Sequence, residues 1–473
     1  MRFTELSDYP LPAGRLTAWV PSTRCDGATW SADARPLAYT HEDHCARGSS
    51  DRAASASWLG GVFEIHHRYD ADKVASALRA WMLRHETFRT TVVENLDGQG
   101  TERFSRRTTS GELLGVDAVA HQTSTSEHMH AKVIDFFDNH ISPFAWPHCV
   151  AATIETPESF LLIFGADHSV MDAYSMLLAI SEIHRLYEYE LFGTDPGLPD
   201  VGSHLDFSVH DRELGNSVVA EHHAVKTWSR FLRQSGGKFP AFPLPVDTSV
   251  GSEDAAAQQG SSSSWLLNAE QAEAVNVYSR RAGHGMQSAI LASVALANRE
   301  LTGDPTLRFT MPMHTRHELA YRFSVGWYVG IVPVEVNLRG ATTFEDCLAA
   351  ATTAVASAKE LARFPYPRIA ELLDNSAIPR FALSYLDVRY VPDAEQWPQW
   401  RARTLRGRSE SNDEVYFWIS RAPAGLTIST RFPGNTTATG NVERLISTFG
   451  SMLTSVADGG IFSHAADETQ RAS

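Results

Sequence analysis

The strongest constraint on the fold is a segment in which an apolar run, a polar turn and a long helical pattern follow one another directly. Residues 160–164 read Phe-Leu-Leu-Ile-Phe, the kind of short apolar run that forms a buried strand. The chain then turns polar at Asp167 and His168. An amphipathic pattern, with apolar residues three and four apart, runs over residues 172–192. The segment therefore predicts a strand, a short turn and a helix, with His168 at the mouth of the strand.

This turn carries the residue types of a general base. A histidine titrates near neutral pH, and a carboxylate four residues later, here Asp172, can orient it. The same spacing occurs at His66 and Asp70, where the aspartate precedes a helical pattern and is better explained as a helix cap. Spacing alone therefore makes His168 a candidate base, and the context has to support it.

Composition limits the kind of partner. The 473 residues carry a formal net charge of -15, which argues against a general binder of nucleic acid or of anionic membranes. No apolar stretch reaches membrane-spanning length. The cysteines are too widely spaced for a zinc site or a disulfide framework, so we expect a cytoplasmic protein; they are Cys25, Cys45, Cys149 and Cys347.

One short cluster, His41-Glu-Asp-His-Cys45, has metal-binding residue types. Its histidines are three apart, whereas the zincin pattern places them four apart on one helix face. We therefore interpret the cluster as the end of a strand with polar neighbours.

The chain is expected to form two α+β lobes. Strand and helix patterns fill both halves, and residues 194–203, rich in Gly and Pro, separate them. We place the N-terminal lobe at residues 1–203 and the C-terminal lobe at residues 204–473. Residues 250–264, polar and with four consecutive serines, are expected to be a mobile loop.

Several common catalytic motifs are missing. The sequence contains no Gly-x-Ser-x-Gly elbow, no phosphate-binding Gly-x-x-x-x-Gly-Lys loop and no dinucleotide-binding Gly-x-Gly-x-x-Gly. What remains is a base without a protein nucleophile, which fits direct attack by one bound substrate on another.

Several segments together resemble a known family. Asp167-His-Ser-Val-Met-Asp-Ala173 resembles the motif His-His-x-x-x-Asp-Gly, with Asp167 for the first histidine and Ala173 for the glycine. Arg84-His-Glu-Thr-Phe-Arg89 and the stretch from Met311 to Pro333, which contains Arg316, resemble further family segments. The family's Asp-Phe-Gly-Trp-Gly motif has no counterpart here. The chain resembles the condensation-domain superfamily, which includes chloramphenicol acetyltransferase, and is most similar to its actinobacterial polyketide-associated acyltransferases.

The resemblance implies an architecture and a reaction. The fold would be two chloramphenicol-acetyltransferase-like lobes in a V, with His168 midway along a tunnel between them. An acyl group would pass from a thioester, either acyl-coenzyme A or a phosphopantetheine-linked acyl carrier protein, to an alcohol or amine acceptor. No cofactor is expected to be bound, and a lone chain of this size is expected to be a monomer.

The resemblance also assigns roles around the base. His168 would take the proton of the acceptor, and Asp172 would be mainly structural and pair with Arg316. Backbone N–H groups near Ala173 or in the loop from Ser324 to Gly326 would stabilise the oxyanion. Trp327 is a candidate for the wall of the acyl tunnel, with packing in the core as the alternative.

Three functions stay open at this stage. The first is an ester-forming acyltransferase that acts on a hydroxyl of a sugar, a polyketide or a lipid alcohol. The second is a free-standing condensation enzyme that forms an amide between carrier-bound substrates. The third is an inactive family member that docks a carrier protein or a partner enzyme, although the intact His168 and Asp172 argue against it.

Overall fold

The first lobe is built around β9 (Phe160–Asp167), an entirely buried strand. The structure, a computed structural model, describes residues 3–23, 29–50, 58–95, 103–248 and 258–459. β9 pairs antiparallel with β4 (Trp58–Ile65) and with β8 (Cys149–Glu155), the strand that precedes it in sequence. The seven strands lie in the order β1-β14-β4-β9-β8-β2-β7, with β1 (Phe3–Glu5), β14 (Arg403–Arg406), β2 (Gly14–Thr23) and β7 (Leu114–Ser124).

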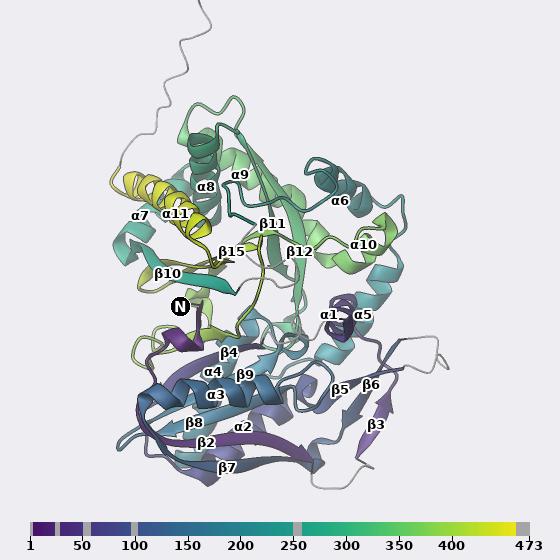
Figure 1. Cartoon of the computed structure of the whole chain (residues 1–473), viewed down its shortest axis with the longest axis vertical. Helices are drawn as coiled ribbons and strands as arrows, with labels where there is room; N and C mark the ends of the chain where they lie inside the picture. Colours follow the sequence, from purple (N-terminus) through teal and green to yellow (C-terminus); the bar gives the residue numbers. More distant parts are fainter. Residues whose placement is uncertain (1–2, 24–28, 51–57, 96–102, 249–257, 460–473) are drawn as a thin grey trace, which may run out of the picture.

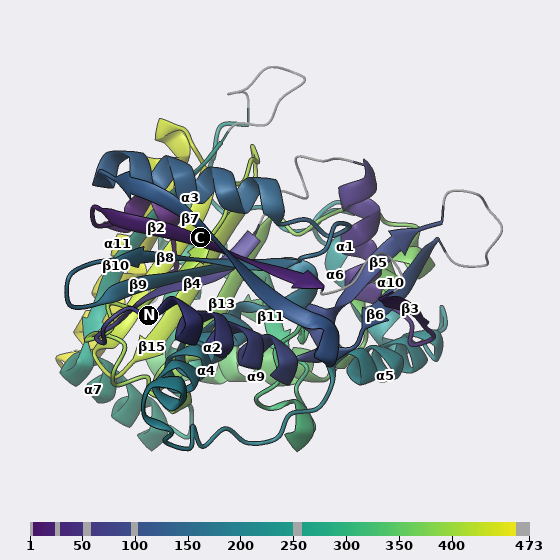
Figure 2. The ribbon, with the colours of Figure 1, turned by 90° about the horizontal axis from the view of Figure 1, so that it is seen from below.

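Helices cover both faces of this sheet (Figure 2). α2 (Ala71–Arg84) and α4 (Ala173–Phe192) pack against each other on one face, and α3 (Ser126–His140) lies on the other. Phe164 faces the core under α2 and α4, and Ile163 faces the core under α3. Because both faces are covered, β9 needs apolar residues at every position, which explains its unbroken apolar run.

Aspartate caps begin both helices next to β9. The carboxylate of Asp172 accepts a hydrogen bond from the backbone N–H of Ser175 at 2.8 Å, and α4 ends at Gly193, whose φ is 70°. Asp70 caps α2 in the same way and accepts from the N–H of Asp72 at 3.1 Å. The interpretation of Asp70 as a cap is therefore confirmed.

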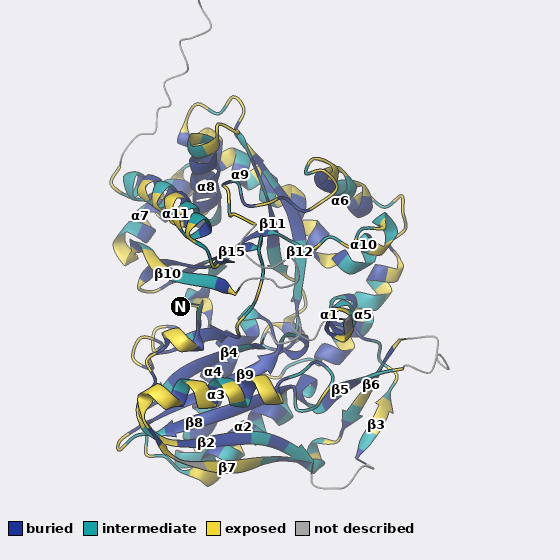
Figure 3. Cartoon of the chain, in the orientation of Figure 1, coloured by how far each residue is buried: buried dark blue, intermediate teal, exposed yellow. Residues whose placement is uncertain are grey.

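The second lobe contains a six-stranded sheet with helices packed on it (Figure 1). Its strands lie in the order β10 (Gln259–Asn268), β16 (Gly425–Pro433), β15 (Val415–Ala422), β13 (Phe381–Asp387), β11 (Thr306–His314) and β12 (Val329–Asn337). Its helices are α6 (His223–Arg233), α7 (Ala269–Arg281), α8 (Met286–Thr302), α9 (Phe344–Lys359), α10 (Tyr366–Leu373) and α11 (Thr436–Ala457). Figure 3 shows the two sheets as buried interiors beneath helices with exposed outer faces.

Two local predictions are wrong. The serines at 261–264 form part of β10 and pair with β16, where the hydroxyls of Ser262 and Thr430 lie 2.8 Å apart. Cross-strand pairing outweighs the polar composition there, while residues 249–257 lie outside the described residues. The His41–Cys45 cluster lies in a helix, α1 (Tyr39–Ser50), rather than at a strand end, because its buried residues fall on one helix face.

One strand of the first sheet comes from the part of the chain that otherwise forms the second lobe. β14 follows the fourth strand of the second lobe in sequence, yet it pairs with β4 and β1 in the first sheet. A single domain boundary near residue 203 therefore stays a prediction about folding units, and the residues around 403–406 join the two lobes physically.

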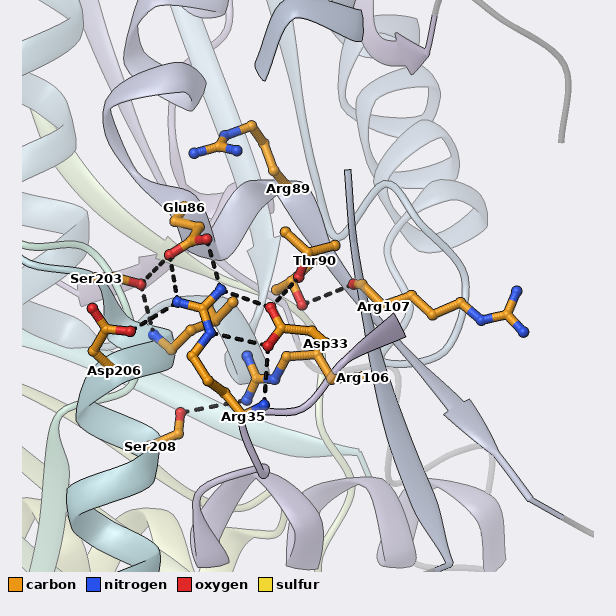
Figure 4. Close-up of polar contacts among 12 residues, drawn as sticks. Asp33, Arg35, Glu86, Arg89, Thr90, Arg106, Arg107, Ser203, Asp206 and Ser208 are labelled. Atoms are coloured by element: carbon orange, nitrogen blue, oxygen red, sulfur yellow. Dashed lines mark hydrogen bonds and ion pairs between the residues drawn. The ribbon is translucent and has the colours of Figure 1, made fainter. Parts of the chain in front are cut away.

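Helix α5 (His204–Asn216) follows the first lobe in sequence and is fastened to it by a polar cluster centred on Arg35 (Figure 4). The guanidinium of Arg35 donates to Asp206 of α5 at 2.8 Å and to Glu86 of η2 (Glu86–Arg89) at 3.0 Å. It also pairs with Asp33 at 2.6 Å, at the end of β3 (Trp30–Asp33). β3 forms a small sheet with β6 (Phe104–Thr109) and β5 (Thr90–Glu94). The cluster fixes the start of α5, from which His204 reaches the candidate site.

Candidate active site between the lobes

His168 lies where the sequence predicts it, directly after β9. It is the first residue of η4 (His168–Val170), a turn capped by the carboxylate of Asp167, which accepts from the N–H of Ser169 at 2.8 Å. The ring is largely withdrawn from water, and its Nδ1 is buried without a hydrogen-bond partner on another residue. Burial, together with the nearby His44, lowers the pKa of His168 to about 4. The imidazole is therefore neutral at pH 7 and able to accept a proton.

Trp327 packs directly on this ring. The two ring centroids lie 3.9 Å apart with an interplanar angle of 33°. Trp327 belongs to the second lobe, in the loop between η5 (Leu319–Tyr321) and β12, and its backbone carbonyl accepts from His204 Nε2 at 3.1 Å. The histidine of one lobe and an aromatic side chain of the other thus meet at the lobe boundary.

Asp172 and Arg316 form a buried ion pair across the same boundary. Arg316 Nη1 donates to Asp172 Oδ2 at 2.8 Å, and Arg316 Nη2 donates to Asp172 Oδ1 at 3.0 Å. The side chains are only 4% and 0% exposed. Burial raises the pKa of Asp172, but Arg316 and the hydrogen bonds from Ser175 outweigh it and leave the pKa below its usual value. The carboxylate is saturated by structural partners, which fits an orienting rather than a reacting group.

The loop that follows Arg316 is held to α4 by the same network. Arg316 Nη2 donates to the carbonyl of Ser324 at 3.2 Å, and the N–H of Tyr328 donates to Asp172 at 3.0 Å. The hydroxyl of Ser175 contacts both the N–H and the carbonyl of Gly326, at 3.1 and 3.0 Å. These bonds fix the loop on either side of Trp327.

The backbone N–H groups of this loop, which we predicted as possible oxyanion donors, have partners within the protein. The backbone N–H groups of Ser324, Val325 and Gly326 already donate to Tyr321 O, His85 Nδ1 and Ser175 Oγ, at 3.2, 3.3 and 3.1 Å. They are therefore occupied and not available to a developing oxyanion. Ala173 opens α4, so its N–H belongs to the first helical turn, where amides lack partners within the helix.

His85 connects the elements that carry the site residues. Its Nε2 lies 2.6 Å from Glu182 Oε2 of α4, while its Nδ1 receives the N–H of Val325. This buried histidine connects α2, α4 and the loop of the second lobe, which is a structural role.

A second buried pair, formed by an aspartate and a histidine, was not predicted from the sequence. Asp167 is fully buried and contacts Nε2 of His44, on α1, at 3.1 Å. The two residues are 123 positions apart, so no local pattern joins them. The one signal in the sequence is the aspartate at the position of the motif's first histidine.

A small cavity lies at the lobe boundary beside Trp327, with His41, Asp211 and Gly330 also in its wall. Its volume of about 10 Å³ has room for roughly one water molecule. Within the described ranges, no group of three or more His, Cys, Asp or Glu side chains has the geometry to hold a metal ion. The helices of those ranges also include none with the length and hydropathy of a membrane span.

Comparisons with known proteins agree with this geometry. A family model described as the condensation domain matches residues 48–384. The acyltransferase PapA3 of Mycobacterium tuberculosis is 26% identical over 95% of this chain and 98% of its own length. The trehalose-2-sulfate acyltransferase PapA2 of Mycobacterium bovis is 24% identical over 96% of this chain and 97% of its own length.

Solved structures give the same answer for the fold. The PapA2 acyl transferase superposes with a TM-score of 0.85 at 22% identity, covering 97% of this chain and 100% of that one. The condensation domain of the monacolin K polyketide synthase MokA superposes with a TM-score of 0.71 at 16% identity, covering 92% and 100%. The expected architecture of two chloramphenicol-acetyltransferase-like lobes is confirmed.

Proposed function

This chain belongs to the condensation-domain family and is an acyltransferase, and we propose that it moves an acyl group from a thioester to a sugar hydroxyl with His168 as the general base. The observation that carries the proposal is the neutral, half-buried imidazole of His168 at the lobe boundary, stacked on Trp327. The sugar acceptor is inferred from the names of relatives, which include a trehalose-2-sulfate acyltransferase.

In the proposed reaction, neutral His168 removes the proton of the acceptor hydroxyl as its oxygen attacks the thioester carbonyl. The tetrahedral intermediate then collapses, the C–S bond breaks, and the imidazolium returns the proton to the leaving thiolate. The products are an ester and a free thiol. Because no protein nucleophile is involved, much of the rate comes from holding both substrates against the histidine.

The remaining parts of the site position these groups. The pair of Asp172 and Arg316 holds the start of α4 and the loop of Trp327 together, so the stack on His168 keeps its geometry. The N–H of Ala173, in the first turn of α4, is our candidate donor to the oxyanion.

The donor is either acyl-coenzyme A or an acyl carrier protein, and both present the thioester on a phosphopantetheine arm. We place the reaction in the cytoplasm, in a monomer. The described cysteines Cys45, Cys149 and Cys347 are free and buried, which fits a reducing compartment.

The test is thiol release from a panel of acyl-coenzyme A donors, with and without trehalose or a mixed pool of alcohols and amines. Wild type is compared with His168→Ala and with His66→Ala as a matched control. His66 has the same His-x-x-x-Asp spacing, but its side chain is 43% exposed and contacts the carbonyl of Gln399 at 3.0 Å. We expect acceptor-dependent release that falls about 100- to 10,000-fold in His168→Ala and is unchanged in His66→Ala, on the scale of losing a general base.

Each other outcome points elsewhere. Equal release by wild type and His168→Ala removes His168 from the chemistry. Amine-dependent release in place of sugar-dependent release favours the amide-forming condensation enzyme. No release from coenzyme A or from a loaded carrier protein favours the inactive docking protein.

A further inference from the structure

The turn that carries His168 is held at both ends by buried carboxylates. Asp172, at its far end, is tied to the second lobe through Arg316. Asp167, at its near end, has no exposed surface and accepts the N–H of Ser169 at 2.8 Å. An ionised carboxylate without solvent contact needs a polar partner, and Nε2 of His44 on α1 lies 3.1 Å from it.

His44 also reaches the stacking partner of the base. Its ring meets the edge of Trp327, with centroids 5.6 Å apart and an interplanar angle of 75°. Trp327 in turn lies 3.9 Å from the ring of His168. One histidine therefore contacts the carboxylate that precedes the base and the indole that covers it.

We propose that His44 and Asp167 form a positioning pair, which fixes the turn and the stacking geometry of His168. The proposal rests on the proposed role of His168 as base. It explains how this chain can carry an aspartate where the family motif has its first histidine, since the missing imidazole is supplied from α1.

The charges around His168 support this role. The groups that act on the ring are His44 on α1, Asp167 at the end of β9 and Asp172 at the start of α4. Burial is the largest cause of the lowered pKa of His168, and His44 is the next. The two aspartates act in the opposite direction. Removing His44 alone takes away a group that lowers the pKa of His168 and leaves the two aspartates that raise it, so that pKa should rise.

Three variants separate the contributions. His44→Gln removes the imidazole but keeps a donor near Asp167, because the amide nitrogen of Gln occupies about the place of Nε2. The double variant His44→Gln with Asp167→Asn also removes the carboxylate and leaves a hydrogen bond between two amides. His41→Gln is the matched control, since His41 is buried on the same helix one turn earlier and has no hydrogen bond to Asp167.

Two measurements report the protonation of His168. The first is the acid limb of kcat/KM for thiol release, and the second is the titration of the His168 ring by NMR with labelled histidine, assigned from its absence in His168→Ala. In His44→Gln both midpoints should rise by about one pH unit, because a nearby group that lowers the pKa of His168 is lost. The double variant should fall between His44→Gln and wild type, and His41→Gln should match wild type.

The NMR titration keeps this inference separate from the proposed function. A rise of the His168 midpoint in His44→Gln supports the pair even where no thiol release is found, in which case the proposed function alone fails. A midpoint that stays at the wild-type value in His44→Gln, whatever its thermal stability, refutes the pair. A rise of the same size in His41→Gln refutes it as well, because the effect is then a general one of helix α1.

Discussion

The buried pair of Asp172 and Arg316 gives the most specific prediction about stability. In Arg316→Met, the carboxylate of Asp172 keeps the N–H groups of Ser175 and Tyr328 but loses both guanidinium bonds. It is left fully buried without a counter-charge. Breaking a buried ion pair from one side costs about 3–5 kcal/mol.

This free energy converts into a modest shift of the melting temperature. The entropy of unfolding is roughly 2.1 cal/mol/K per residue, so a chain of 473 residues has about 1 kcal/mol/K. Arg316→Met is therefore expected to lower Tm by about 3–5 °C. Asp172→Asn should have a similar effect, because it leaves the guanidinium of Arg316 buried without its carboxylate.

A double-mutant cycle isolates the pair. The variant Asp172→Asn with Arg316→Met has no unpaired charge, and Asn can still cap the N–H of Ser175. It loses the bonds of Arg316 to Ser175 Oγ and Ser324 O, each worth about 1 kcal/mol. Urea unfolding of the wild type, the two single variants and the double variant should show the double variant as more stable than either single one.

Two results would refute this account. If the losses of the single variants add within about 0.5 kcal/mol, the two side chains are not coupled. If Asp172→Asn keeps its Tm but loses thiol release as completely as His168→Ala, the carboxylate takes part in the chemistry and is not an orienting group.

Further predictions concern the surroundings of the base. Gly326→Ala places a Cβ 2.5 Å from the ring of His204, and calorimetry should show a loss of about 1–3 kcal/mol from overpacking. Trp327→Ala should lower kcat about 10–100-fold, because His168 is misplaced when it loses the ring stacked on it. Trp327→Phe should keep a stacked ring and most of the rate. Equal losses of kcat in the two variants would show that stacking does not position His168. Burial lowers the pKa values of His168 and His204 from 6.5 to about 4 and about 3. As pH falls below 6.5, these two histidines therefore bind protons in the unfolded chain before they do so in the folded protein. The free energy of unfolding, measured by urea titration, should fall as pH falls below 6.5, by up to about 1.4 kcal/mol per pH unit for each histidine. Asp211, whose pKa burial raises to about 6, should offset one of them.

Local patterns predicted most of the elements around the site. The apolar run of β9, the turn at His168 and the helical pattern of α4 are all decided by neighbouring residues, so a short window contains the needed information. The serines at 261–264 are the counterexample. Their polar composition suggests a loop, but pairing with β16, which is more than 160 residues away, makes them a strand.

The residues of the candidate site also fall into two groups, those that local sequence predicted and those whose role depends on distant parts of the chain. The sequence pointed to His168 and Asp172 by spacing, and to Arg316 by resemblance to a family. It could not show that the N–H groups around Val325 are already used, because their acceptors, including His85, lie on other elements. The role of an amide depends on its partner, and that partner is a property of the folded chain.

By itself the sequence determined a strand, turn and helix that present a histidine, because periodicity and capping act over a few residues. The tertiary structure alone decided which groups surround that histidine. It brought Trp327 from the second lobe onto the ring of His168 and His44 from α1 against Trp327, and it closed both carboxylates of the turn away from water. Burial and charge at a site depend on every element packed against it, and for that reason the chemistry of His168 becomes visible only in the folded protein.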